Sequence, residues 1–150
     1  DGDPETWDVH HWQEINPVHT EALLQLTCGG PQIIYHGGLV HTRLRYFDAV
    51  TRQPGLPEDV GALVTDLGAE HVCVTLCNLS VLHERRLIVQ AGAFGEHCFT
   101  DVRIGEQSNV PPQPVQRSTL TICLPPGRSL DLRLGMQRYV HTPTYRLPEW

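Results

Sequence analysis

The middle of the chain contains three short apolar segments that are separated by turn residues. Residues 71–77 and 85–91 are rich in valine, leucine and isoleucine, and residues 99–104 alternate between apolar and polar side chains. Segments of this length and composition are typical of β-strands. The polar residues 78–80 and the glycine-flanked residues 92–95 favour turns between them. The pattern predicts three consecutive strands in a β-sheet core.

Two β-hairpins are predicted outside this region. Residues 32–36 and 39–47 flank a Gly-Gly pair, which tolerates the positive φ angles of a tight turn. Successive strand side chains point to opposite faces, and one apolar set should face the core: Val40, Leu44 and Tyr46. Residues 118–124 and 130–134 alternate on either side of a Pro-Pro-Gly turn, so we expect a second hairpin with one polar and one apolar face.

Two short helices are also predicted. Thr20 can cap a helix over residues 20–26, which the following Gly-Gly pair would end. A second helix is predicted over residues 57–67, because Pro57 and two acidic residues suit a first turn. Its apolar residues recur at helical spacing: Val60, Leu63, Val64 and Leu67.

Proline marks the remaining segments. Residues 105–117 contain three prolines, which forbid a central strand, so we expect an exposed loop that crosses from one sheet to another. Residues 139–142 are expected to add an edge strand. About seven short strands with one or two short helices predict a mainly β fold, a two-layer antiparallel β-sandwich. A jelly-roll-like closure is the alternative. We assign residues 18–150 to one domain and residues 1–17 to an extended arm or linker.

The charge of the chain limits its partners. The formal net charge is −6 and all 11 basic residues are arginine, as in an arginine-biased bacterial genome. We expect no nucleic-acid partner, because such proteins need a concentrated basic face. The absence of lysine excludes Schiff-base chemistry on a lysine and a phosphate-loop lysine. No run of 18 apolar residues occurs, so no membrane span and no membrane partner are expected.

Cysteine usage points to a reducing compartment. The chain has five cysteines, an odd number, which excludes a complete disulfide framework. Cys73 and Cys77 would lie about 13 Å apart at ~3.3 Å per strand residue, which is too far for a bond between them. We therefore expect the thiols to be small buried side chains and the protein to be cytoplasmic.

Histidine suggests a candidate ligand site. His36 and His41 flank the Gly-Gly turn, and Glu96 and His97 lie in another glycine-flanked turn. Together they are suitable ligand types for zinc or iron. Surface and turn histidines explain the set equally well, so we assign no metal and no other cofactor. With Tyr35, these four residues are the candidate ligand-binding residues.

No catalytic group is assigned. Cys98 is adjacent to His97, but strand neighbours face opposite ways and cannot act together as nucleophile and base. Exposed aromatic side chains could form a platform on which a sugar stacks, or could pack against a partner. The candidates are Trp7, Trp12, Tyr35, Tyr139, Tyr145 and Trp150.

The run Val72-x-Val74-Thr75-Leu76-x-Asn78-x-Ser80, followed by residues 86–90, resembles the C-terminal β-sandwich modules of bacterial glycoside hydrolases. The resemblance covers residues 70–104, and the helix predicted over residues 57–67 is not a regular part of such modules. It implies an accessory domain that supports a larger catalytic domain and contributes no catalytic residues.

These observations favour a non-catalytic β-sandwich accessory or interaction domain of a larger bacterial protein, with a carbohydrate-active enzyme as the candidate parent. The missing initiator methionine adds to the expectation of a longer protein. Its expected partners are another domain of the parent chain or a second copy, and a carbohydrate. The alternatives are a small jelly-roll-type metalloenzyme that uses the His/Glu site, and a free-standing carbohydrate-binding module.

Overall fold

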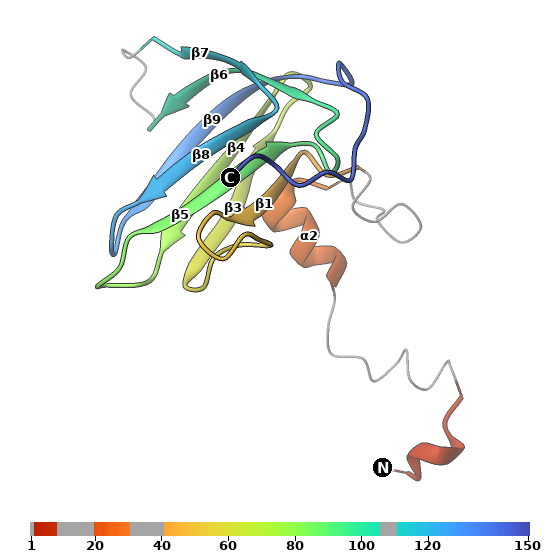
Figure 1. Ribbon diagram of the computed structural model, residues 1–150. Coiled ribbons are helices and arrows are strands. Elements are labelled where there is room, and N and C mark those ends of the chain that lie inside the picture. The colour runs from red at the N-terminus through yellow and green to blue at the C-terminus, as the bar shows by residue number, and fades with distance from the viewer. Residues whose placement is uncertain (1, 9–19, 31–40, 106–110) are drawn as a thin grey trace.

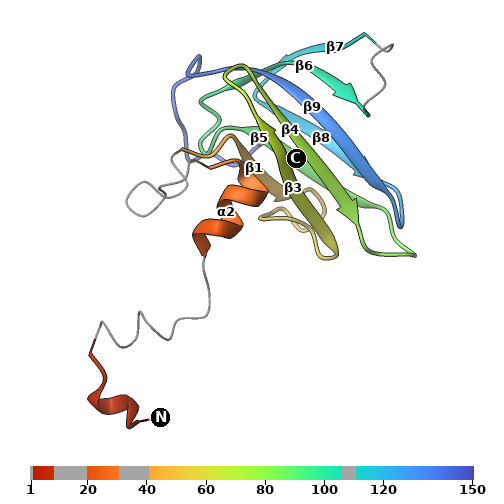
Figure 2. The same ribbon diagram turned by 180° about the vertical axis from the view of Figure 1, so that it is seen from behind.

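The computed structural model describes residues 2–8, 20–30, 41–105 and 111–150. Two antiparallel sheets form a β-sandwich, as predicted (Figure 1). The four-stranded sheet has the order β2 (Gln53–Pro54), β1 (Leu44–Asp48), β5 (Arg85–Ala91) and β8 (Thr119–Leu124). The five-stranded sheet has the order β3 (Val60–Leu67), β4 (His71–Asn78), β9 (Ser129–Gln137), β6 (Cys98–Ile104) and β7 (Gln113–Arg117). Figure 2 shows the five-stranded sheet from its outer side.

The core lies between the two sheets because each strand buries alternate side chains. Along β4 the even-numbered residues are buried, and the odd-numbered residues are half-buried on the outer face. Val72, Val74 and Leu76 meet the inward residues of β5 and β9. Removing such apolar side chains from water is worth roughly 1.5–3 kcal/mol each. The outer face of the five-stranded sheet is thereby left free to carry polar groups.

The helix predicted over residues 57–67 is wrong, because residues 60–67 form the edge strand β3. This strand pairs with β4 along its whole length. Val60, Ala62 and Val64 pack against the core on one face, as alternation requires. Pairing with a neighbouring strand has therefore overridden a helical spacing that involves only four residues.

The second predicted hairpin is also wrong. β8 pairs with β5 in one sheet, whereas β9 pairs with β4 and β6 in the other. The Pro-Pro-Gly turn therefore carries the chain between the sheets. Alternation reveals which face of a strand is buried, but it does not identify the neighbouring strand. The strands predicted over residues 71–77, 85–91 and 99–104 are confirmed, although the second of these lies in the opposite sheet from the other two.

The proline-containing segments differ from the prediction in detail. Residues 113–117 form β7 at the edge of the sheet, where Pro114 costs no central ladder bond. The crossing to the other sheet follows at once, since β8 begins at Thr119. Residues 139–142 form no strand, so this edge-strand prediction is wrong.

The predicted N-terminal helix is confirmed as α2 (Thr20–Cys28), which packs against β3 and β1. Pro4–Thr6 form a 3-10 turn, η1. Leu44 and Tyr46 face the core as predicted, while Val40 and the first strand of the predicted hairpin lie outside the described residues. The boundary predicted between residues 17 and 18 also lies outside them. Neither helix in the described part of the chain is long and apolar enough to cross a membrane.

Candidate functional site

The structure places Glu96 and His97 together in the turn between β5 and β6. Both side chains are buried, with 4% and 2% of their surface exposed. The Glu96 carboxylate lies over Gly92, where no β-carbon would fit, and accepts a 2.8 Å hydrogen bond from the backbone N–H of Phe94. Glu96 Oε1 is 3.7 Å from His97 Nε2. The carboxylate thus holds its own turn closed.

The same turn binds the segment that follows β9. The Tyr139 N–H donates to His97 Nδ1 at 3.1 Å, and the N–H groups of Val140 and His141 donate to the Glu96 carbonyl. Burial lowers the pKa of His97, and the nearby charges of Arg138 and Arg43 act in the same direction against an opposing effect of Glu96. His97 is therefore a neutral acceptor at neutral pH, with a structural role in this contact.

The other predicted site residues do not join this pair. His41 is exposed and lines a hollow of about 170 Å³ with Gly29, Arg43, Leu67 and Arg138. His36 and Tyr35 lie outside the described residues. Within the described residues, His41, Glu96 and His97 do not belong to a group of three side chains that could share one metal ion. Ligand binding by this set stays a prediction.

A larger polar surface lies on the outer face of the five-stranded sheet. It contains a hollow of about 500 Å³ whose lining includes two carboxylates, two guanidinium groups and two threonines. The residues that carry these groups are Asp66, Asp131, Arg103, Arg133, Thr65 and Thr75. They come from β3, β4, β9 and β6. Strand alternation points the side chains on β4, β9 and β6 away from the core, and a shift in the pairing register of β3 turns Asp66 outward as well. Four strands therefore build one polar depression, in which β6 and β9 are distant from β3 and β4 in sequence.

A second hollow, of about 710 Å³, adjoins the first, since Arg133 lines both. Gly135 is one of its lining residues. Asp101 and Thr100 from β6 extend across the space that a β-carbon on Gly135 would occupy. Thr100 Oγ1 and Asp101 Oδ2 are 2.8 Å apart. The glycine on β9 is therefore what lets the polar side chains of β6 reach over the sheet toward β4.

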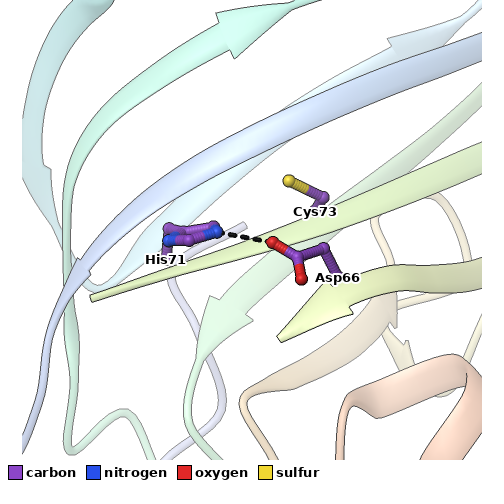
Figure 3. A group of neighbouring side chains, drawn as sticks. All are labelled: Asp66, His71 and Cys73. Atoms are coloured by element: carbon purple, nitrogen blue, oxygen red, sulfur yellow. Dashed lines mark hydrogen bonds and ion pairs between the residues drawn. The ribbon is translucent and has the colours of Figure 1, made fainter. Parts of the chain in front are cut away.

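Three side chains with metal-ligand chemistry meet between these hollows (Figure 3). His71 and Cys73 project from the outer face of β4, and Asp66 projects from β3 beside them. His71 Nε2 and Asp66 Oδ2 are 2.6 Å apart. One ligand atom from each of the three residues lies within 4.8 Å of the others. This cluster was not among the residues predicted from the sequence.

The pKa values of Asp66 and Cys73 are shifted in opposite directions. The hydrogen bond from His71 lowers the pKa of Asp66, and the charges of His71 and Arg133 add to that effect. Burial raises the pKa of the Cys73 thiol, and the charge of Asp66 raises it further, whereas Arg133 lowers it. Cys73 is therefore protonated at neutral pH and is a poor nucleophile, since the thiolate is the reactive form.

Part of this cluster had a signal in the sequence. His71 and Cys73 are two residues apart on a strand that was predicted correctly, so they must share a face. Asp66 had no such signal, because its position depends on the pairing of β3 with β4. Comparisons of the chain with family models, with curated proteins and with solved structures find no match. The geometry of the outer face is therefore the basis for a functional proposal.

Proposed function

We propose that this chain is a non-catalytic β-sandwich accessory domain that binds an acidic sugar on the outer face of its five-stranded sheet. In this proposal it serves a larger bacterial protein, with a carbohydrate-active enzyme as the candidate parent. The observation that carries the proposal is the arginine pair in the hollow of about 500 Å³. A depression of this size is typical of small-molecule sites.

Arg103 and Arg133 are direct partners on β6 and β9, and both line the hollow. Like charges placed directly opposite each other in a sheet are destabilising. Arg103 Nε is buried and has no hydrogen-bond partner among the described residues. An unpaired buried donor costs about 1–3 kcal/mol. A ligand carboxylate in the hollow would reduce the repulsion between the two guanidinium groups, whose forked N–H groups match a carboxylate in geometry.

The remaining polar groups suit a ligand that also carries hydroxyls. Thr75 Oγ1 donates a 2.6 Å hydrogen bond to Asp131 Oδ1, which holds that carboxylate at the side of the hollow. The Asp66 carboxylate is exposed nearby. Carboxylates accept hydrogen bonds from hydroxyl groups. One acidic group and several hydroxyls on a small ring describe a uronic acid.

Aromatic stacking has less support as the binding mode. Tyr139, Tyr145 and Trp150 are exposed, but each ring makes an edge contact with another ring of the domain, at centroid distances of 4.7, 5.0 and 6.1 Å. The residues that line the hollow include none of the described aromatic candidates. Trp12 and Tyr35 lie outside the described residues. Polar recognition by the arginine pair is therefore the mode that we propose.

The non-catalytic part of the proposal is supported by the state of Cys73. This thiol lies at the hollow, yet burial and Asp66 raise its pKa, so it is protonated at neutral pH. All five cysteines are free thiols, which supports the proposal of a reducing, cytoplasmic compartment.

The binding proposal is tested by calorimetric titration of the purified chain with galacturonic acid oligomers and with neutral galactose oligomers. We expect binding of the acidic oligomers alone. Arg133→Gln should weaken it about 10-fold to 100-fold, because one charge-assisted hydrogen bond is worth ~1.5–3 kcal/mol. Arg117→Gln on the exposed edge strand β7 is the matched control and should leave binding unchanged.

Equal binding of neutral oligomers, or full binding by Arg133→Gln, would contradict the proposal. The accessory role is tested separately by the reading frame that encodes the chain. A catalytic domain encoded in the same frame supports this role, and a frame limited to this domain refutes it.

A further inference from the structure

The side chains of Asp66, His71 and Cys73 form a compact group on the outer face of the five-stranded sheet (Figure 3). We propose that these three residues bind a thiophilic divalent metal ion, with Zn²⁺ as the best match. This proposal goes beyond the acidic sugar, because it depends on His71 and Cys73 and on a different chemistry, and Asp66 is the one side chain that both proposals use.

The ligand types fit this ion. Zinc binds thiolate sulfur, imidazole nitrogen and carboxylate oxygen, and sites with three protein ligands keep a fourth position open. Tetrahedral bonds of about 2.0–2.3 Å would place the three ligand atoms roughly 3.3–3.7 Å apart. The atoms are already within 4.8 Å of one another. The 2.6 Å contact between Asp66 and His71 would have to widen, which needs only rotation of two partly exposed side chains.

The backbone positions the three ligands before any ion binds. His71 and Cys73 are alternate residues of one strand, so their side chains lie on the same face. The pairing register of β3 with β4 shifts by one residue between Val64 and Asp66, and this shift places Asp66 directly opposite Cys73. Gly68 completes the arrangement, since a β-carbon there would overlap the His71 ring. Alternation, the register shift and one glycine therefore aim the three side chains at a single point.

The proton and charge balance of binding is simple. The ion replaces the proton of the Cys73 thiol, which is released to solvent, and accepts a lone pair from neutral His71 and one from the Asp66 carboxylate. The two anionic ligands then neutralise the charge of the ion. The fourth position is left for water, because Asp66 is exposed and His71 is partly exposed.

Cobalt titration of the tag-free chain is the direct test. Co²⁺ replaces Zn²⁺ in such sites and gives a thiolate-to-cobalt charge-transfer band, together with intense visible bands when it is tetrahedral. We expect both signals, and Zn²⁺ should abolish them at one equivalent. Cys73→Ser should lose the charge-transfer band. His71→Gln should weaken Zn²⁺ binding at least about 10-fold, because even the loss of an outer-shell partner costs ~10–100-fold.

Cys77→Ser is the matched control, since Cys77 lies on the same face of the same strand and has similar burial. It should keep both signals. Arg133→Gln should also keep the band, which separates failure of this proposal from failure of the sugar proposal. If Cys73→Ser does not fold, Asp66→Asn at an exposed position is the second variant, and it should weaken Co²⁺ and Zn²⁺ binding at least about 10-fold, whereas unchanged binding would count against the site. A wild-type chain without the band, or a band that survives Cys73→Ser or requires Cys77, would overturn the metal site.

Discussion

Asn78 is expected to be the most important polar side chain for the stability of the sandwich. Only 1% of its surface is exposed. Its Nδ2 lies 2.8, 3.0 and 3.2 Å from the carbonyl oxygens of His83, Leu124 and Pro125, and its Oδ1 accepts from the Ser80 N–H at 3.0 Å. The two N–H bonds of the Asn78 amide are thus shared among three carbonyl acceptors. The residue links the end of β4 in one sheet to the end of β8 in the other.

Asn78→Ala should lower the free energy of unfolding by about 3–4 kcal/mol, at ~1 kcal/mol for each lost hydrogen bond and more for a carbonyl left buried. With a slope of about 2 kcal/mol per molar urea, the unfolding midpoint should fall by roughly 1.5–2 M. Urea unfolding followed by far-ultraviolet circular dichroism measures this shift.

The matched control for Asn78 is Leu79→Ala, at the next residue, whose side chain is 67% exposed. We expect it to change stability by no more than about 0.5 kcal/mol. Asn78→Asp keeps the shape but turns a carboxylate toward three carbonyl oxygens, so it should be at least as destabilising as Asn78→Ala. If Asn78→Ala and Leu79→Ala shift the midpoint equally, the bridging role that we assign to Asn78 is refuted.

Two further predictions concern the turn between β5 and β6. The pKa of His97 is lower in the folded state than in the unfolded chain. As the pH falls, the unfolded chain therefore binds a proton at this histidine before the folded protein does. The free energy of unfolding should fall as the pH drops through about 6.5, and it should level off below the folded pKa. Urea midpoints at a series of pH values should show this step, and His97→Gln should remove it; an unchanged step would contradict the assignment. Gly92→Ala should destabilise by about 1–3 kcal/mol, since Gly92 has φ 86° and the Glu96 carboxylate occupies the position of the new methyl group. Gly127→Ala, at φ 61° and in open space, should cost less, and equal thermal unfolding midpoints for the two variants would refute the role of Glu96.

Much of the fold could be predicted from the sequence, because the alternation of apolar and polar side chains along a strand can be recognised within a single segment. The alternating residues of β4 and the turn at Asn78 could be identified without knowledge of any partner. The Ser80 N–H does donate to Asn78 Oδ1, as a polar turn requires. Strand pairing could not be identified in this way. β8 and β9 are adjacent in sequence but lie in opposite sheets, because each completes a different set of neighbours.

In the candidate sites too, the sequence indicated residues that are close in sequence but not those that strand pairing brings together. Glu96 and His97 were correctly placed in one glycine-flanked turn, but the sequence did not indicate that the segment after β9 would cover them. Arg103 and Arg133 are separated by 30 positions in the sequence and become neighbours only through the pairing of β6 with β9. A polar depression shared by four strands has no local signal. The depression depends on the order of the strands in the sheet, and short-range sequence patterns do not reveal that order.

The irregular end of β3 bears both on the wrongly predicted helix and on the unpredicted Asp66–His71–Cys73 cluster. If β3 were a regular strand, Val60, Ala62, Val64 and Asp66 would all face the core, and a carboxylate would be buried. The register shift after Val64 turns Asp66 outward, toward His71, and puts Leu67 opposite the buried Val72. The pairing of Leu67 with Val72 adds a three-residue step after Val64, which matches part of the helical spacing, although Leu63 and Leu67 are both exposed in the strand. The same register shift brings Asp66 opposite Cys73.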